Sequence, residues 1–425
     1  MSESKHIIVI ADDITGAAEM AGIAFRHGLH VQLTTQALSL PDSTEDLPDV
    51  LVIATDTRSM TEAEAVAETL RIVSSLYTLN PLTSPNPSCR RGILPLQGES
   101  EGVTTLNSQP STLDPRLSTL NPIHFSLFKK TDSALRGHVV AELEALLAST
   151  DYKKACYIPA NPSKGRIIRN GIYYIGSVPI HETDFSFDPE FPAVSSRMDE
   201  RFPHCEEKDI CWMNATCEED IKQAVALADE HTLLAGAADL FTAFIEARCS
   251  TLDPQPSTTN NSDYHLSFSI YHLAKRTPTL IVCGSTQSKP LDIGIPVCPM
   301  PLSVYNQETD AEKWIASLME RLYPSSPSLI LTIPHHHRTG KEIAVHLRTV
   351  MGKVVQKFVQ NHPPQELIIE GGATAWQILQ QLGWQNFDIT DEIAPGVIRM
   401  RALGTDTFVT MKPGSYPWGS LFENV

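Results

Sequence analysis

The 425-residue sequence lacks any apolar run of the roughly 18 residues that a membrane-spanning helix needs. It also lacks an excess of basic residues, because 33 Lys and Arg stand against 50 Asp and Glu, for a formal net charge of −17. Nucleic acids and anionic membrane surfaces would be repelled by this charge. A small anionic substrate is still allowed, since a few nearby basic side chains outweigh a distant field. Residues 1–5 show no signal peptide, so we expect a cytoplasmic protein that binds neither nucleic acid nor a membrane.

Paired cysteine motifs are missing as well. None of the eight cysteines forms a Cys-x-x-Cys pair, and even Cys205, Cys211 and Cys217 stand six residues apart. We interpret them as structural thiols of a reducing cytosol. The run His335–His337 has the side chains for a metal site, but a proline before it and a glycine nearby after it favour a solvated loop. We therefore predict no metal site built by protein side chains.

Several familiar catalytic and phosphate-binding signatures are absent. Neither G-x-x-x-x-G-K-[ST] nor G-x-G-x-x-G occurs. No G-x-S-x-G surrounds Ser285, so this serine does not have the setting of a hydrolase nucleophile. Asp12 and Asp13 are adjacent and lack the Asp-x-Asp spacing of aspartyl-phosphate phosphatases. Any phosphate chemistry must use a different arrangement.

The most informative segment lies near the start of the chain. Ile7–Ile10 is an unbroken β-branched run, which predicts a strand buried on both faces. Asp12 and Asp13 follow it, Thr15–Gly16 opens a helix, and Gly28 stands where that helix should end. In open α/β sheets, ligands bind beyond the carboxyl ends of the strands. Helix capping explains one of the two acids, whereas a ligand site explains both.

The rest of the first half repeats this arrangement of strand, polar cluster and helix. Strands are predicted over 30–35, 50–54, 124–130 and 156–160, and helices over 61–76, 139–147, 218–228 and 240–247. Parallel strands place their carboxyl ends on one edge, so the polar groups there should converge. Carboxylates and arginines together suit a small polyol that carries an acid. The alternative is an ion-pair network that only holds the loops in place. This alternative is well supported for Arg136, because Asp132 precedes it by four residues. The polar groups are Asp12, Asp13, Asp56, Arg58, Lys130, Asp132, Arg136, Asn161 and Arg166.

Two proline-rich segments interrupt the pattern. Residues 77–123 have neither helix nor strand period, and a Thr-Leu-Asn/Asp-Pro phrase that they contain returns at 251–254. We interpret 77–123 and 249–264 as low-complexity insertions that loop out and carry no chemistry; a proline-rich recognition segment is the alternative. The predicted division is a first domain over 1–248, a linker over 249–264 and a second domain over 265–425.

In the second half, glycine, serine and threonine follow the strands. Strands are predicted over 279–284, 328–333, 366–369, 398–402 and 408–412, with a long helix over 343–358. Glycine turns at helix N-termini let backbone N–H groups approach a phosphate. Three such turns in one domain indicate a nucleotide site. Alternating strands and helices in both halves predict two α/β domains, each with a largely parallel sheet flanked by helices. The turns are Gly284–Ser285, Gly371–Gly372 with Thr374, and Gly414–Ser415 beside Lys412.

In this order, the clusters resemble the motifs of the four-carbon acid sugar kinase family. The resemblance spans nearly the whole chain outside the two insertions. Two departures occur in the third motif, where Thr131 and Ala134 replace the usual Ile and Thr. The matching segments are Ala11–Gly16, Thr55–Arg58, Lys130–Gly137, Gly284–Ser285, Gly371–Ala375 and Lys412–Ser415.

The resemblance implies an ATP-dependent kinase that acts, with Mg²⁺, on the terminal hydroxyl of a four-carbon sugar acid such as threonate, erythronate or 3-oxo-tetronate. The N-terminal domain would bind the acid, the C-terminal domain would bind ATP, and the active site would lie in the cleft between them. Substrate would contact Asp12, Asp13, Arg58, Lys130, Asp132 and Arg136, and nucleotide would contact Ser285, Gly371, Gly372, Thr374, Lys412 and Gly414.

Within this scheme, Asp13 or Asp132 would take the proton of the attacking hydroxyl, and Arg58 or Arg136 would hold the substrate carboxylate. Magnesium would bridge the phosphates with few protein ligands. Two other functions stay open: a sugar-acid-binding regulator without catalysis, and a phosphatase with an aspartate nucleophile. The oligomeric state, including a homo-oligomer, is also left open.

Overall fold

The computed structural model describes residues 6–36, 47–78, 125–188, 190–249, 277–284, 293–322, 328–334 and 340–414. The predicted insertion 77–123 lies outside these ranges except for residues 77–78, which end a helix. The second insertion, 249–264, lies outside them except for residue 249. The His335–His337 run and Ser285 also lie outside the described residues.

The N-terminal half contains seven parallel strands in the order β2-β3-β1-β4-β10-β5-β9. The strands are β1 (His6–Ala11), β2 (Val31–Thr34), β3 (Val50–Ala54), β4 (Phe125–Lys130), β5 (Lys154–Ile158), β9 (Ile210–Trp212) and β10 (Thr232–Gly236). The flanking helices are α1 (Ile14–Arg26), α2 (Glu62–Thr78), α3 (Val139–Ser149), α5 (Glu218–Leu227) and α6 (Ala238–Cys249). Strand β1 lies in the middle of this group and is almost wholly buried, as its β-branched run predicted.

The C-terminal half combines a parallel group, β12-β13-β11-β14-β17, with two antiparallel strands, β16 and β15. The strands are β11 (Thr279–Cys283), β12 (Val297–Pro299), β13 (Ser328–Thr332), β14 (Glu366–Glu370), β15 (Asn386–Ala394), β16 (Val397–Ala402) and β17 (Phe408–Lys412). Its helices are α8 (Leu302–Tyr305), α9 (Glu312–Leu322), α10 (Lys341–Asn361) and α11 (Gly372–Leu382).

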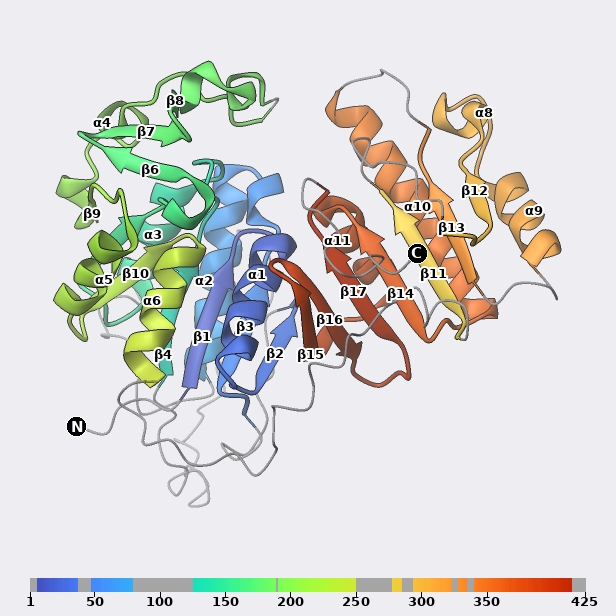
Figure 1. The fold of residues 1–425 in the computed structure, drawn as a ribbon, viewed down its shortest axis with the longest axis horizontal. Helices are drawn as coiled ribbons and strands as arrows, with labels where there is room; N and C mark the ends of the chain where they lie inside the picture. The colour runs from blue at the N-terminus through green and yellow to red at the C-terminus, as the bar shows by residue number, and fades with distance from the viewer. Residues whose placement is uncertain are drawn as a thin grey trace, which may run out of the picture.

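The two halves share one 14-stranded sheet, which the sequence did not predict. Strand β15 pairs antiparallel with β2, so that Phe387 stands opposite Leu33. The Gln32 side chain donates a hydrogen bond to Asp388 Oδ1 at 2.9 Å across this junction. Figure 1 shows the halves side by side, with β15 and β16 between them. The predicted two-domain α/β architecture is confirmed, and β2 is paired on both sides rather than being a sheet edge.

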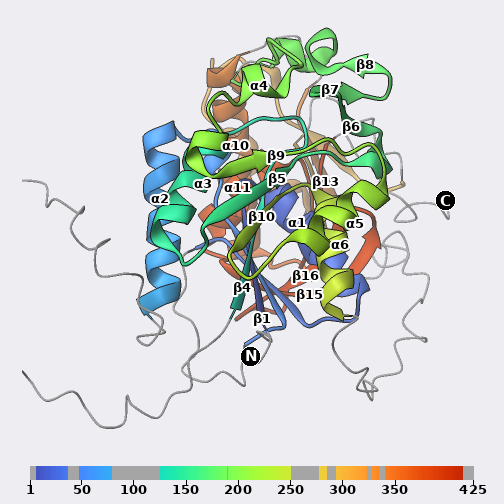
Figure 2. The same cartoon turned by 90° about the vertical axis from the view of Figure 1, so that its left-hand side faces the viewer.

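A small antiparallel sheet covers one end of the N-terminal half. We call residues 161–197, which contain it, the cap. Figures 1 and 2 show its strands above the carboxyl ends of the parallel strands. Arg166, one of the polar groups predicted to follow the strand 156–160, begins the first strand of this sheet. The elements are η5 (Pro162–Lys164), β6 (Arg166–Arg169), β7 (Ile172–Ile175), β8 (Val178–Pro179), η6 (Ile180–Glu182) and η7 (Asp184–Phe187). Helix α4 (Met198–Arg201) and turn η8 (Glu206–Lys208) follow it.

Helix α1 begins and ends close to the residues that the sequence predicted. Ala17, Met20, Ala21 and Ala24 are buried against the sheet. Gly28 adopts a φ of +78°, the left-handed conformation that follows a helix end. Within the described ranges, no helix is long and apolar enough to cross a membrane.

Candidate active site

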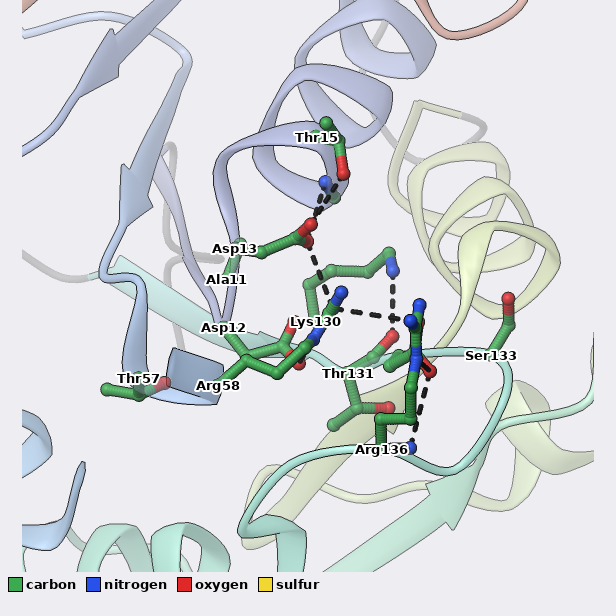
Figure 3. Close-up of polar contacts among 12 residues, drawn as sticks. Ala11, Asp12, Asp13, Thr15, Thr57, Arg58, Lys130, Thr131, Ser133 and Arg136 are labelled. Atoms are coloured by element: carbon green, nitrogen blue, oxygen red, sulfur yellow. Dashed lines mark hydrogen bonds and ion pairs between the residues drawn. The ribbon is translucent and has the colours of Figure 1, made fainter. Parts of the chain in front are cut away.

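Asp13 lies at the N-terminus of α1 and caps it. Its Oδ1 accepts a hydrogen bond from the Gly16 amide at 2.9 Å, and its Oδ2 accepts one from the Thr15 hydroxyl at 2.5 Å. The capping interpretation is therefore right for one of the two acids. The same carboxylate also contacts Arg58, whose Nη2 lies 3.0 Å from Asp13 Oδ1, so Asp13 is more than a cap (Figure 3).

Arg58 brings three carboxylates together. It follows β3 in the turn η2 (Thr57–Ser59), and its Nε and Nη2 donate to Asp12 Oδ2 at 3.0 and 2.9 Å. The same Nη2 lies 3.6 Å from Asp132 Oδ1. Burial alone would lower the pKa of Arg58, but the charges of Asp12, Asp13 and Asp132 raise it well above its usual value. Arg58 stays cationic and holds the ends of β1, β3 and β4 together.

Asp132 is fully engaged by protein donors. Arg136 donates to it through Nε at 2.8 Å and Nη2 at 3.0 Å, and the Ala134 amide donates at 3.0 Å. Burial alone would raise the pKa of Asp132, but the guanidinium groups of Arg58 and Arg136 lower it far below its usual range. The ion pair between Asp132 and Arg136 that the sequence spacing indicated is present.

Asp12 differs from its two neighbours. Its side chain is buried, and its Oδ1 has no hydrogen-bond partner among the described residues. Burial and the nearby charge of Asp13 raise the pKa of Asp12, although Arg58 opposes the shift. A buried carboxylate oxygen without a donor is costly unless a ligand meets it.

Lys130 turns toward α1. Its Nζ donates to the Thr131 carbonyl at 2.7 Å and lies 3.8 Å from Glu19 Oε2. Glu19 also pairs with Lys164 of the cap. The sequence analysis did not identify Glu19 or Lys164, because a glutamate inside a helix and a lysine in a loop carry no local signal of a shared site.

The cap adds aromatic and acidic groups. Two guanidinium groups lie near the Phe185 ring, whose centroid is 5.6 Å from Arg136 Cζ and 5.7 Å from Arg166 Cζ. Asp188 Oδ2 lies 3.4 Å from Arg136 Nη1. Arg166 donates a hydrogen bond to the Ser133 hydroxyl. Neither Phe185 nor Asp188 was expected, since 184–188 has no recognisable motif.

The glycine turn after β14 lies directly against α1. A Cβ atom on Gly372, the first residue of α11, would come within 2.5 Å of Thr15 Cγ2. A Cβ on Gly284 would likewise meet Thr374 Oγ1 at 2.2 Å, so α11 and the end of β11 also approach closely. Gly371 precedes the helix with a φ of +99°. Small residues thus allow the nucleotide turn predicted from the sequence to reach the carboxylate cluster.

Two further predicted nucleotide residues lie at the end of β17 and just after it. Lys412 Nζ is buried and lies 2.5 Å from Glu370 Oε1, so its charge is paired inside the protein. Gly414 is the last described residue and forms a turn. Ser285 lies outside the described residues.

The two halves also approach each other near Asp56. This residue follows β3 and has a left-handed φ of +56°. Its Oδ1 accepts a hydrogen bond from the Ser59 hydroxyl at 3.1 Å. Burial raises the pKa of Asp56 to about 6, although Arg348 of α10 is close enough to oppose the shift. The Nε of Arg348 is buried without a hydrogen-bond partner among the described residues. Sequence reasoning did not identify Arg348, which sits inside a long amphipathic helix.

The described ranges contain no group of three or more His, Cys, Asp or Glu arranged to hold a metal ion. Five of the six predicted substrate residues nevertheless form one connected set of ion pairs at the carboxyl ends of β1, β3 and β4: Asp12, Asp13, Arg58, Asp132 and Arg136. The charge of Lys130 lies close enough to lower the pKa of all three aspartates. Carboxylates that orient hydroxyl groups, guanidinium groups that bind anions, and a glycine turn at a helix N-terminus are the groups that phosphoryl transfer to a small acid requires.

Comparison with known proteins finds one family of domains in each half of the chain. A family of sugar-binding N-terminal domains matches residues 7–84 and 115–203, and a family of nucleotide-binding C-terminal domains matches residues 301–416. A 3-oxo-tetronate kinase of Haemophilus influenzae is 22% identical, and the alignment covers 98% of both chains. A D-threonate kinase of Salmonella typhimurium is 28% identical over 194 residues, 46% of this chain and 35% of that protein.

Solved structures show the same fold over almost the whole chain. A Haemophilus influenzae protein superimposes with a TM-score of 0.61 at 21% identity, and a Salmonella typhimurium LT2 protein with a TM-score of 0.68 at 16% identity. In each case 98% of both chains is covered. With its two family domains in this order and its full-length relatives, the chain belongs to the four-carbon acid sugar kinase family.

Proposed function

We propose that this protein transfers the γ-phosphoryl group of ATP to the terminal hydroxyl of a four-carbon sugar acid of the threonate, erythronate or 3-oxo-tetronate class. The observation that carries the proposal is the contact between Gly372 and Thr15. It brings the N-terminus of α11, in the nucleotide-binding half, to the first turn of α1, where Asp13 lies. A phosphate on one side and an alcohol on the other would meet at this border.

Asp13 is the best-placed group to orient the attacking hydroxyl. Its side chain is 18% exposed, against 3% for Asp12 and 9% for Asp132, so it is the most accessible of the three acids. It also adjoins Thr15 and hence the other half. Burial opposes ionisation, but Arg58, Lys130 and the Thr15 and Gly16 donors leave the pKa of Asp13 below its usual value. An ionised Asp13 accepts the hydroxyl hydrogen bond and takes the proton as the bond to phosphorus forms.

Asp132 fits a positioning role instead. Its oxygens already accept hydrogen bonds from Arg136 and from a backbone amide, and its pKa is strongly lowered. Its side chain is also only 9% exposed, against 18% for Asp13, so a substrate hydroxyl reaches it less easily. Of the two proton acceptors that the sequence offered, we therefore favour Asp13 and assign Asp132 to holding Arg58 and Arg136 in place.

ATP fits the glycine turn that precedes α11. The amides of residues 372–374 have no partner inside the helix, because the first intrahelical bond is from the Ala375 amide to the Gly371 carbonyl. Free amides and the helix dipole favour phosphate there. Mg²⁺ bound with ATP would neutralise phosphate charge, and the unpartnered Oδ1 of Asp12 is the protein oxygen that suits it or its water ligands.

A panel of four-carbon sugar acids, assayed with and without Mg·ATP, tests the proposal. We expect ATP consumption that depends on one or more of the acids, and a rise in melting temperature when the acid binds. A regulator would be stabilised by the acid without consuming ATP. A phosphatase would release phosphate from a phosphorylated acid in the absence of ATP. Failure of every acid to support ATP turnover would remove the kinase proposal.

A further inference from the structure

The cations at the site are not equally available to a substrate. Arg58 is surrounded by three carboxylates, and Arg136 is held by Asp132 and Asp188. Lys130 and Lys164 both contact Glu19. These four side chains are already committed to protein anions, so an incoming carboxylate would have to displace one of them.

Among these cations of the N-terminal half, Arg166 is the exception. No carboxylate of the described residues lies within ion-pair distance of it, and its one side-chain hydrogen bond goes to the neutral hydroxyl of Ser133. Its guanidinium group faces the same Phe185 ring as that of Arg136. Two like charges beside one ring repel each other, and Arg166 lacks the counter-ions that Arg136 has. This part of the site therefore favours an additional anion.

Building on the proposed function, we propose that Arg166 of the cap binds the carboxylate of the acid substrate, with the Ser133 hydroxyl beside it. Arg166 is thereby the residue that makes the site specific for an acid over a neutral polyol. Neither Arg58 nor Arg136, the two arginines that sequence reasoning offered for this role, has a free face for a two-pronged bond.

The location of Ser133 agrees with a short substrate. Ser133 immediately follows Asp132, and Asp132 and Asp13 both contact the guanidinium group of Arg58. In Figure 3 the side chains of Lys130 and Arg136 are drawn between Asp13 and Ser133. A small acid that binds Arg166 and Ser133 would therefore lie next to Asp132, at the edge of the cluster of carboxylates around Arg58.

The test compares Arg166→Gln with Arg169→Gln. Arg169 is a matched control because it lies on the same strand and stacks on Tyr174 at 4.9 Å instead. With a four-carbon acid, Arg166→Gln should lower kcat/KM by about 100-fold or more, mainly through KM, because a buried charge pair is lost. The KM for ATP should stay within a factor of about two, and Arg169→Gln should resemble wild type.

Selectivity gives a readout that a merely structural role would not move. The ratio of kcat/KM for the acid to that for the matching uncharged four-carbon polyol should fall by the same factor of about 100 in Arg166→Gln. If Arg166→Gln does not fold, Arg166→Lys replaces it; loss of the planar fork should still raise the KM for the acid about 10-fold.

An unchanged acid-to-polyol ratio in a folded variant would overturn the assignment, as would a raised KM for ATP with an unchanged KM for the acid. Wild-type protein that neither binds nor phosphorylates any acid would instead refute the proposed function, so the two failures can be told apart.

Discussion

Lys129 and Glu142 form an ion pair in the interior of the sugar-binding half, with side chains only 1% and 2% exposed. The Glu142 carboxylate also accepts a hydrogen bond from the Thr57 hydroxyl at 3.2 Å. Thr57 immediately precedes Arg58 in η2. The pair therefore fixes, from inside the core, the turn that carries the central arginine of the site.

Replacing Glu142 by Ala should lower the free energy of unfolding by about 3–5 kcal/mol, because the buried ammonium group of Lys129 would lose its partner. Urea denaturation followed by fluorescence measures this. Glu218→Ala is the control, since Glu218 pairs with Lys222 on the exposed surface and should cost about 1 kcal/mol or less. Equal losses in the two variants would contradict a structural role for the buried pair.

Asp13→Asn should separate capping from catalysis. Asparagine is also a good N-cap residue, so the helix cap should be kept, and the melting temperature should fall only through the weakened contact to Arg58. Turnover should nevertheless fall on the order of 10²-fold or more if Asp13 accepts the proton. Steady-state kinetics beside a thermal melt distinguishes the two effects, and a kcat near the wild-type value would clear Asp13 of the role.

Asp132→Asn should behave differently. Loss of the negative charge weakens the contacts to Arg136 and Arg58, so we expect lower stability and a larger effect on the KM for the acid than on kcat. The same assay and melt serve here. A drop in kcat alone, with the melting temperature unchanged, would instead make Asp132 the proton acceptor.

Gly372→Ala should disturb the border between the halves. Its new Cβ would lie 2.5 Å from Thr15 Cγ2, so α11 or α1 must shift, and we expect kcat to fall by roughly 10- to 100-fold. Thr15→Ser removes that methyl group and keeps the hydroxyl that bonds Asp13. The double variant should recover most of the lost kcat, whereas Thr15→Ser alone should be near wild type. A double variant as slow as Gly372→Ala would argue against this contact.

Asp56→Asn should change how stability depends on pH. The folded-state pKa of Asp56 is raised from 3.8 to about 6, so between these values the folded protein binds more protons than the unfolded chain. The Asp56 carboxyl group therefore lowers the free energy of unfolding least below about pH 4, and it lowers this free energy further as the pH rises to about 6.

Because asparagine also tolerates a left-handed backbone and bears no charge, Asp56→Asn should equal wild type below about pH 4 and exceed its stability by about 1–3 kcal/mol above about pH 7. Urea unfolding from pH 3.5 to 8 measures the difference. A difference that stays constant across this range would rule out the titration of Asp56 as its cause.

Local patterns predicted much of the framework. The β-branched run 7–10, the polar turn after it and the apolar stripe of α1 each follow from rules that act within a few residues. Strand β10 (Thr232–Gly236) was missed, because a five-residue run between two helices resembles a connecting loop, although it lies between β4 and β5. The antiparallel strand β15 was missed as well, since its polar residues Asp388, Thr390 and Asp391 interrupt an apolar pattern.

Some residues of the candidate site could likewise be predicted from the sequence, and others could not. Asp12, Asp13, Arg58, Lys130, Asp132 and Arg136 could be named in advance because each follows a recognisable strand, and parallel strands end on one edge. Arg166 was named among the polar groups at the strand ends, but without a role of its own. Phe185 and Arg348 were not named, since each reaches the site through the packing of an element far away in the sequence.

The sequence by itself determined two α/β halves, one with acids and arginines at its strand ends and one with glycine turns, because these features depend on neighbouring residues. Only the tertiary structure decided that β2 and β15 join the halves into one sheet, that Gly372 meets Thr15, and that none of the described carboxylates pairs with Arg166. The physical reason is that edge pairing, close helix approach and charge balance depend on groups brought together by folding, and no local pattern encodes them.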